Sequence, residues 1–459
     1  MHLNGARIGL EIHVQLNTKR KLFCFCSTKA TKPNTQVCEV CLGMPGAKPM
    51  LNNRALMFAI GLALALKSGI NELSRFDRKT YFYPDLPKNY QITQYHYPLS
   101  RGGYIELNNK KIRITRIQLE EDPGAITYTQ HIDVSKYSLI DYNRSGIPLC
   151  EVVTEPDFSS AKEVKQFLKK FVSIIKHLKI YSSAMSLRVD TNVSIGKNPR
   201  VEIKNIGSIK DVVSAIDHEI FRQTQLIQKK EKIKQETRRF TGSSTQLMRE
   251  KETEEDYGYI IDPDLPPIIP GRWLQDIFKS MPELPDQRVQ RMMKQYNINK
   301  HQALAIVSEK ELADFFEAVA KKVNPKLVAS WTAGQLLKVL NYNNFFFSET
   351  KLKPPQFVSF LELVQEDEIS DRAGDLLLRE LVLNPQNPKQ LARKLNFLKM
   401  TDKELLKLTK AVLKKHRQAI EQYKKGKQKP LMFLIGQVIS ESKGRADAKK
   451  VKKEIIKNL

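Results

Sequence analysis

The sequence has no apolar run long enough to cross a bilayer. The longest run, residues 55–66, is interrupted by Gly61, whereas a membrane helix needs about 20 apolar residues. The N-terminus also lacks the apolar core of a signal peptide and the Ser- and Arg-rich pattern of a transit peptide. We therefore expect no association with a membrane and a cytoplasmic location.

Acidic residues are few relative to basic ones. The chain of 459 residues has 76 Lys and Arg against 50 Asp and Glu, which gives a formal net charge of +26. Such an excess suits a polyanionic partner, and nucleic acid is the leading candidate. The alternative source of part of this excess is a generally lysine-rich proteome.

Cysteine is rare, but four of the five cysteines lie close together in the sequence. Cys24 and Cys26 form a CxC motif, and Cys38 and Cys41 form a CxxC motif eleven residues further on. In a reducing compartment this pattern indicates metal binding rather than disulfides. Four thiolates suit tetrahedral zinc and leave no open coordination position, so we predict a structural zinc site. The alternative is a set of reduced cysteines in the core.

Residues 8–14 are predicted to form a β-strand with two different faces. Apolar residues alternate with Gly9, Glu11 and His13, so Glu11 and His13 project from the same face. A carboxylate and an imidazole held in this way suit a divalent cation or an acid–base pair. The alternative is the exposed polar face of an edge strand.

Further carboxylates follow in patterns that also indicate strands. Glu120 and Glu121 precede a turn at residues 122–124. Adjacent strand residues face opposite sides, so only one of the two points inward unless a bulge intervenes. Glu151 lies inside an apolar strand pattern, where a carboxylate is costly to bury unless it is paired or bound to metal. Glu151 is therefore the best ligand candidate after Glu11 and His13.

Common signatures of nucleotide binding are missing. Neither GxxxxGK[ST] nor GxGxxG occurs, so a nucleotide site here would be neither a P-loop nor a Rossmann site. Residues 76–88 combine cations with aromatic rings and are cut by two prolines, which predicts a loop or edge segment rather than a regular element. These side chains suit a nucleotide or a structural turn equally well. Two strand patterns, residues 186–195 and 201–206, also carry polar faces, with Arg188, Asp190, Asn192 and Ser194 on the first and Glu202 and Lys204 on the second.

Helical periodicity dominates the rest of the chain. Residues 52–67, 160–179 and 211–234 are predicted helices, and the pattern after residues 284–286 is helical to the end. Residues 397–459 contain eighteen basic and six acidic residues, and helices faced with lysine suit a phosphate backbone. The alternative is a solvated helical bundle without a nucleic-acid partner.

Taken together, these motifs resemble one family over nearly the whole chain. The sequence is similar to the GatB subunit of the tRNA-dependent amidotransferase, a heterotrimer that makes Gln-tRNA(Gln) or Asn-tRNA(Asn) from mischarged Glu-tRNA or Asp-tRNA. The matching segments occur in the family's order: IGLEIHVQL, PNTQVCEVCLGMPGAKPMLN, FDRKTYFYPDLPKNYQITQY, LEEDPG, DYNRSGIPLCEVVTEPD, LRVDTNVSI, VEIKNIGS, ETRRF and DPDLPP.

The resemblance implies an α+β fold with three domains. A mixed α/β cradle domain with a zinc knuckle would occupy residues 1–283, a helical domain residues 284–396, and a basic helical tail that binds tRNA residues 397–459. The resemblance also implies that ATP phosphorylates the side-chain carboxylate of tRNA-bound Glu or Asp, and that ammonia then displaces the phosphate. The glutaminase partner, GatA, would release the ammonia from glutamine, and a small partner, GatC, would complete the complex.

Roles for individual residues follow from the same resemblance. Mg²⁺, which bridges charged oxygens in phosphoryl transfer, would be bound by a catalytic cluster of Glu11, His13, one of Glu120 and Glu121, and Glu151. Since Mg²⁺ prefers oxygen ligands, His13 would act through water. ATP and phosphate contacts would come from Lys79, Tyr81, Asp190, Asn192 and Lys204, and the structural Zn²⁺ would be held by Cys24, Cys26, Cys38 and Cys41. The alternative function is a zinc-stabilised tRNA-binding module without chemistry of its own.

Overall fold

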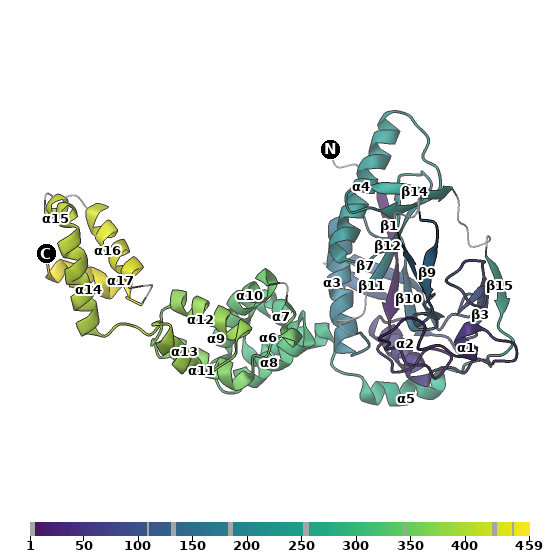
Figure 1. Ribbon diagram of the computed structural model, residues 1–459, viewed down its shortest axis with the longest axis horizontal. Coiled ribbons are helices and arrows are strands. Elements are labelled where there is room, and N and C mark those ends of the chain that lie inside the picture. The colour runs from purple at the N-terminus through teal and green to yellow at the C-terminus, as the bar shows by residue number, and fades with distance from the viewer. Residues whose placement is uncertain are drawn as a thin grey trace. The chain divides into compact units, whose positions relative to one another are not determined.

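The chain folds into two compact units, Met1–Leu284 and Pro285–Leu459. The structure is a computed structural model that describes residues 5–107, 110–129, 135–181, 187–250, 257–343, 345–424, 429–442 and 445–459. The first unit contains a large sheet with helices, and the second unit contains helices (Figure 1). Every helix in these described ranges is too short or too polar to cross a membrane.

A ten-stranded sheet forms the centre of the first unit. Its strands follow the order β14-β13-β12-β11-β1-β10-β7-β5-β2, and β6 pairs with β7. The β12–β13 pair is parallel, whereas β1 is antiparallel to both of its neighbours. The strands are β1 Ala6–Gln15, β2 Gly69–Ile70, β5 Ser100–Arg101, β6 Tyr104–Leu107, β7 Lys110–Glu121, β10 Pro148–Thr154, β11 Leu187–Ile195, β12 Val201–Ile206, β13 Glu236–Phe240 and β14 Thr245–Glu250.

Two small sheets and several helices complete the first unit. One small sheet has the order β15-β3-β4, and the other is the hairpin of β8 and β9. Their strands are β3 Asp77–Thr80, β4 Tyr90–Thr93, β8 Ala125–Tyr128, β9 Ser138–Asp141 and β15 Gly258–Ile261. The helices are α1 Glu39–Leu42, α2 Asn53–Ala65, α3 Ala161–His177, α4 Ile209–Gln228 and α5 Gly271–Ser280.

The two faces of strand β1 have opposite environments, as its alternating sequence predicts. Ile8 and Ile12 are fully buried and share one apolar core with Phe167 of α3 and Ile216 of α4. Helices α3 and α4 pack against each other and lie beside this sheet (Figure 1). The other face of β1 carries its polar side chains, so helix packing anchors the strand from behind the candidate site.

Helices α3 and α4 begin at residues that satisfy their free amide groups. The Ser160 hydroxyl accepts a hydrogen bond from the Glu163 amide, and the Ser208 hydroxyl accepts one from the Asp211 amide. A serine cap of this kind contributes about 1 kcal/mol. Both helices therefore start beside the ends of the strands that precede them.

Two sequence-based expectations about the first unit were wrong in detail. Residues 76–88 were predicted to lack regular structure, but Asp77–Thr80 forms the middle strand of the β15-β3-β4 sheet. The helix predicted over residues 211–234 spans Ile209–Gln228 and is followed by Lys230 in the left-handed region with φ 56°. Partner strands distant in sequence cause the first difference, and a turn after the helix causes the second.

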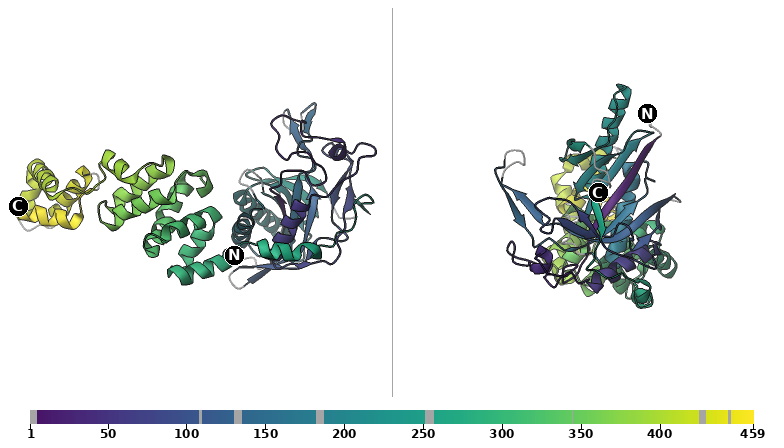
Figure 2. Two further views of the ribbon diagram at one scale, coloured as in Figure 1. Left: turned by 90° about the horizontal axis from the view of Figure 1, so that it is seen from below. Right: turned by 90° about the vertical axis from the view of Figure 1, so that its right-hand side faces the viewer.

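The second unit contains helices arranged around two separate apolar cores (Figures 1 and 2). The larger core includes Phe316, Phe357 and Phe360, and the smaller one includes Val412 and Leu434. The elements are α6 Pro285–Tyr296, α7 Lys300–Val307, α8 Lys310–Ala320, α9 Pro325–Ser330, η2 Trp331–Leu336, α10 Leu337–Tyr342, η3 Phe347–Glu349, α11 Pro354–Gln365, α12 Asp371–Leu383, α13 Pro388–Lys394, α14 Asp402–Lys415, α15 Arg417–Lys424, α16 Lys429–Glu441 and α17 Ala448–Lys457.

Candidate active site and thiol cluster

Neighbouring strands of the central sheet place polar side chains on the face opposite helices α3 and α4. His13 of β1 lies opposite Glu151 of β10, and Glu11 of β1 lies opposite Asp190 of β11. Gln118 of β7 lies opposite Glu151 on the other side of β10. Residues directly opposite one another project from the same face of a sheet, so four adjacent strands build one polar surface.

The first group on this surface consists of His13, Glu120 and Glu151. One ligand atom from each lies within 4.8 Å of the others, and His13 Nε2 is 3.4 Å from Glu120 Oε1. The Gln118 side-chain amide donates to Glu151, and the Thr93 hydroxyl donates to Glu120 over 3.4 Å. Gln118 and Thr93 thus orient both carboxylates, a role that the sequence analysis did not assign to them.

The second group consists of Glu11, Asp190 and Glu202. Their carboxylate oxygens also lie within 4.8 Å of one another. The Asn192 side-chain amide donates to Glu11 over 3.1 Å, and Lys204 Nζ lies 3.2 Å from Glu202. Although burial opposes it, the pKa of Lys204 is raised by the carboxylates of Glu202, Asp190 and Glu11. A lysine ammonium therefore stands at the edge of this acidic group.

The crowding of carboxylates shifts the acid–base properties of both groups. Burial and neighbouring carboxylates, chiefly Glu151, raise the pKa of Glu11 to about 7. Burial and Glu151 also raise the pKa of Glu120 to about 7, although His13 opposes this shift. Burial lowers the pKa of His13, but the nearby carboxylates, Glu120 first, more than offset this effect and raise it. A divalent cation would relieve the mutual repulsion of these carboxylates.

The donor atoms of the two groups fit a hard divalent cation such as Mg²⁺, because carboxylate oxygens are its preferred protein ligands. The arrangement differs from the single cluster that was predicted. Glu11 lies with Asp190 and Glu202, whereas His13 lies in the neighbouring group. The strand register causes this division, since it sets Glu11 opposite Asp190.

Glu120 rather than Glu121 belongs to the first group. Lys88 Nζ lies 2.7 and 2.6 Å from the two carboxylate oxygens of Glu121, and the Ile92 amide donates to the same carboxylate. The β7–β10 ladder is regular at this point, with Glu121 opposite Pro148 and its register shift further along. Successive side chains therefore alternate as they do in an ordinary strand. This geometry corrects the assignment of Glu121 to the metal-binding cluster.

Lys79 and Tyr81 lie close to the first group. Lys79 Nζ is 4.3 Å from the centroid of the Tyr257 ring, and the Tyr81 ring meets Tyr257 edge-on with centroids 5.7 Å apart. The charge of Lys79 lowers the pKa of Glu120. Burial, followed by Asp85 and Glu120, raises the pKa of Tyr81. The sequence analysis gave no role to Tyr257, which lies between the two predicted residues.

A cavity of about 280 Å³ opens beside the second group. Its lining includes Arg7, Gly9, Glu11, Asn192 and Arg200. Gly9 shares a face of β1 with Arg7 and Glu11, and a glycine inside a strand often marks a place that a ligand approaches. The cavity thus joins two guanidinium groups to the acidic surface, which suits an anion bound together with a metal ion.

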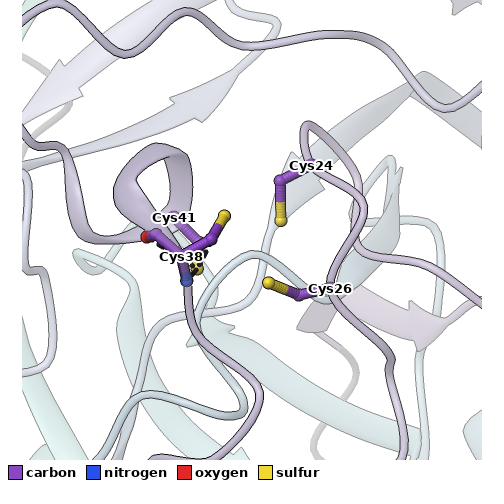
Figure 3. Close-up of side chains that lie close together, drawn as sticks. All are labelled: Cys24, Cys26, Cys38 and Cys41. Atoms are coloured by element: carbon purple, nitrogen blue, oxygen red, sulfur yellow. Dashed lines mark hydrogen bonds between the residues drawn. The ribbon is translucent and has the colours of Figure 1, made fainter.

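The four cysteines of the CxC and CxxC motifs come together in space (Figure 3). One sulfur from each of Cys24, Cys26, Cys38 and Cys41 lies within 4.8 Å of the others. The α1 turn brings the last two together, with their sulfurs 3.9 Å apart. Four sulfur donors in one place fit a tetrahedral zinc ion.

Lys21 is a buried neighbour of the thiol cluster that the sequence analysis missed. Its side chain is fully buried, and its Nζ donates to Cys41 Sγ over 3.6 Å and to the Tyr142 carbonyl over 3.0 Å. The Cys38 amide also donates to Cys41 Sγ over 3.1 Å. A hydrogen bond from Cys24, the Cys38 amide and Lys21 lower the pKa of Cys41 to about 5, against the effect of burial. The environment of Cys41 therefore favours a thiolate.

Comparisons with known proteins agree over almost the whole chain. Residues 6–275 match a family described as the GatB/GatE catalytic domain, and residues 314–459 match one described as the GatB domain. Three similar proteins each carry the name of the corresponding subunit of aspartyl/glutamyl-tRNA(Asn/Gln) amidotransferase. The protein of Carboxydothermus hydrogenoformans is 41% identical, with 97% of each chain covered. That of Methanosarcina mazei is 42% identical over 99% of this chain and 98% of its own, and that of Thermotoga neapolitana 40% identical over 98% of each.

Proposed function

The chain belongs to the GatB/GatE family of aminoacyl-tRNA amidotransferase subunits, and from this premise we propose that it catalyses the ATP-dependent amidation of Glu or Asp carried by a mischarged tRNA. The side-chain carboxylate of the tRNA-bound residue would attack the γ-phosphorus of ATP and release ADP. Ammonia would then attack the resulting acyl phosphate, lose a proton and displace inorganic phosphate. The products would be Gln-tRNA(Gln) or Asn-tRNA(Asn), ADP and phosphate.

The observation that carries this proposal is the pair of acidic groups on one sheet face with cations beside them. His13, Glu120 and Glu151, and the neighbouring Glu11 group, would hold Mg²⁺. A bound Mg²⁺ supplies a positive charge that bridges and neutralises phosphate oxygens. Lys204 and Lys79 lie at the edges of the two groups, where they can stabilise the charge that develops on a transferred phosphoryl group.

The cavity beside the second group supports a nucleotide or phosphate contact near these carboxylates. Arg7 and Arg200 line it together with Asn192. Guanidinium groups bind phosphate oxygens through paired N–H donors. We therefore assign the anionic part of ATP to the surface between this cavity and Lys204, with Asp190 and Asn192 as the contacts nearest to Glu11.

The thiol cluster would have a structural role. Four cysteine sulfurs would complete the coordination of Zn²⁺ and leave no position for a substrate. The segment between the two motifs is bonded to residues 140–143, for example through the Asn34 side chain, which donates to the Ile140 carbonyl and accepts from the Tyr142 amide. A zinc-held loop would thus support the segment that leads into β10 and Glu151.

The relatives' name designates one member of a larger enzyme, so we propose GatA and GatC as partners of this chain, with GatA releasing ammonia from glutamine. The test is amidation by the assembled complex with separately prepared Glu-tRNA(Gln) and Asp-tRNA(Asn). We expect amide formation that requires ATP and Mg²⁺ and uses at least one of the two substrates. Binding of both tRNAs without ATP hydrolysis or amide formation would instead support a zinc-stabilised binding module.

A further inference from the structure

A second cavity lies in the C-terminal helices, far along the chain from the acidic groups. It has a volume of about 810 Å³ and lies where α14 ends, α15 follows and α16 begins. Four cationic side chains line it, together with His416 and Phe433. The cations are Lys414, Lys415, Arg417 and Lys429, and no described lining residue is acidic.

The charges around this cavity are largely uncompensated. Lys415 pairs with Glu441 over 3.0 Å. Within the described part of the chain, no carboxylate forms an ion pair with Lys414, Arg417 or Lys429. Unpaired cations that converge on one hollow create a positive potential there, and this potential attracts an anion. The ligand that fits this cavity is therefore negatively charged.

The same hollow contains an accessible aromatic ring. The Phe433 side chain is 46% exposed, and its ring meets His416 edge-on with centroids 5.2 Å apart. The imidazole supports one edge of the phenyl ring, while part of the ring stays open to solvent. Aromatic rings of this kind stack on the bases of single-stranded RNA, while cations nearby contact the phosphates.

We propose that this cavity binds one unstacked nucleotide of the tRNA, with its base on Phe433 and its phosphates between Lys414, Arg417 and Lys429. The inference rests on the proposed function, because that function makes tRNA the nucleic-acid partner. A regular duplex would not supply the ligand, since its bases are stacked inside the helix. A loop or unpaired position of the tRNA can turn a base outward into a hollow of this size.

The two kinds of contact make different thermodynamic predictions, which allows a sharp test. Binding of uncharged tRNA to the full-length protein is measured over a series of salt concentrations for Phe433→Ala and Lys414→Met. Loss of stacking in Phe433→Ala should weaken affinity by about 5- to 100-fold without changing the salt slope. Loss of one phosphate contact in Lys414→Met should reduce the slope of log K against log salt by about 0.7 to 0.9.

Matched controls separate stacking from general effects on the helix. Met432 is adjacent, 68% exposed and not part of the lining, so Met432→Ala should leave affinity within about two-fold. Phe433→Trp keeps an aromatic face and should retain most of the affinity. The proposal is overturned if Phe433→Ala binds as tightly as Met432→Ala, or if Phe433→Trp is as weak as Phe433→Ala. A wild-type protein that does not bind tRNA would contradict the proposed function itself, whereas normal binding that ignores Phe433 contradicts only this cavity.

Discussion

The Nζ atom of Lys21 lies 3.6 Å from Sγ of Cys41, and the whole lysine side chain is inaccessible to solvent. A buried ammonium is costly unless an opposite charge compensates it. Within the described part of the chain, the partners of this ammonium are the Cys41 sulfur and the Tyr142 carbonyl, and no carboxylate pairs with it. The arrangement is therefore best explained by thiolates that are held as ligands of a metal ion, whose excess negative charge Lys21 partly balances.

This relationship predicts a specific effect of Lys21→Met, which keeps a side chain of similar length without its charge. Loss of a group that donates to a metal ligand typically weakens metal affinity by about 10- to 100-fold, and we expect that change for zinc. Zinc affinity is measured by competition with a chromogenic chelator, with the exposed neighbour Lys19→Met as the control. The stability of the chelator-treated protein should not fall, because the substitution removes a buried charge. Equal zinc affinities for the two variants would exclude a charge-balancing role.

Glu120 and Glu121 are adjacent, yet their substitutions should have opposite consequences. Glu120→Gln removes a carboxylate from the acidic group that contains Glu151, so we expect amidation by the assembled complex to fall about 100-fold or more. Stability should hold or rise, because a repelled carboxylate has been neutralised. Both quantities are measured on each variant, as turnover and as the free energy of unfolding.

Glu121→Gln serves as the matched partner of that experiment. It leaves the buried Lys88 ammonium without its carboxylate, and breaking a buried ion pair costs about 3–5 kcal/mol. We expect a clear loss of stability, with turnover per folded molecule close to that of the wild type. A Glu121→Gln protein that is stable but inactive would return Glu121 to the catalytic group and remove Glu120 from it.

These two glutamates also show how far the sequence alone reaches. The alternation of strand β1 and the helices α2 and α3 are evident from local periodicity, and the structure confirms them. The spacing of the four cysteines was enough to predict that their sulfurs meet. Local patterns could not choose between Glu120 and Glu121, because that choice depends on the register between β7 and β10.

Contacts between distant strands account for the remaining differences. Glu202 was placed on a polar strand face without a role, and it joins Glu11 because β12, β11 and β1 are neighbours in the sheet. Arg239 of β13 was not singled out, although the parallel register sets it beside Lys204 and extends the polar surface. Lys21 carried no signal at all, because a lysine in a turn ordinarily points to solvent. Such positions follow from sheet topology, which one sequence does not specify.

The raised pKa values of Glu11 and Glu120 predict how stability depends on pH in the metal-free protein. Each pKa is about 7 in the folded chain, against an ordinary value of 4.5. The folded state therefore binds more protons than the unfolded state between these values, so stability falls as pH rises from about 4.5 to 7 and is unaffected below that range. The loss is on the order of 3 kcal/mol for one such carboxyl.

The measurement uses chelator-treated protein and follows the first unit alone. The two tryptophans lie one in each unit, so Trp273 fluorescence in a Trp331→Phe background reports on the sheet. Replacing both glutamates by glutamine should remove the pH dependence between 4.5 and 7. Added Mg²⁺ should restore stability at pH 7.5 in the parent protein and have little effect on the double variant. An identical pH profile for the two proteins would contradict the assigned shifts.

Gly9 offers the most direct test of where the anionic part of ATP binds. Its missing side chain leaves open the cavity of about 280 Å³ between Arg7 and Glu11. A Cβ atom at this position would lie 3.7 Å from the Cα of Pro156, which is an ordinary contact. Gly9→Ala should therefore fold and remain active. Gly9→Val fills more of the cavity, while valine suits a strand.

We expect Gly9→Val to keep its stability and zinc content but to raise the KM for ATP by about ten-fold or more, because the side chain occupies the space that phosphate oxygens would use. The KM for glutamine, whose hydrolysis is assigned to the glutaminase partner, should not change. The comparison is made on the assembled complex at saturating mischarged tRNA. If Gly9→Ala and Gly9→Val have the KM of the wild type for ATP, the nucleotide does not enter this cavity and the phosphate contacts must lie on the side of Lys79 and Tyr81.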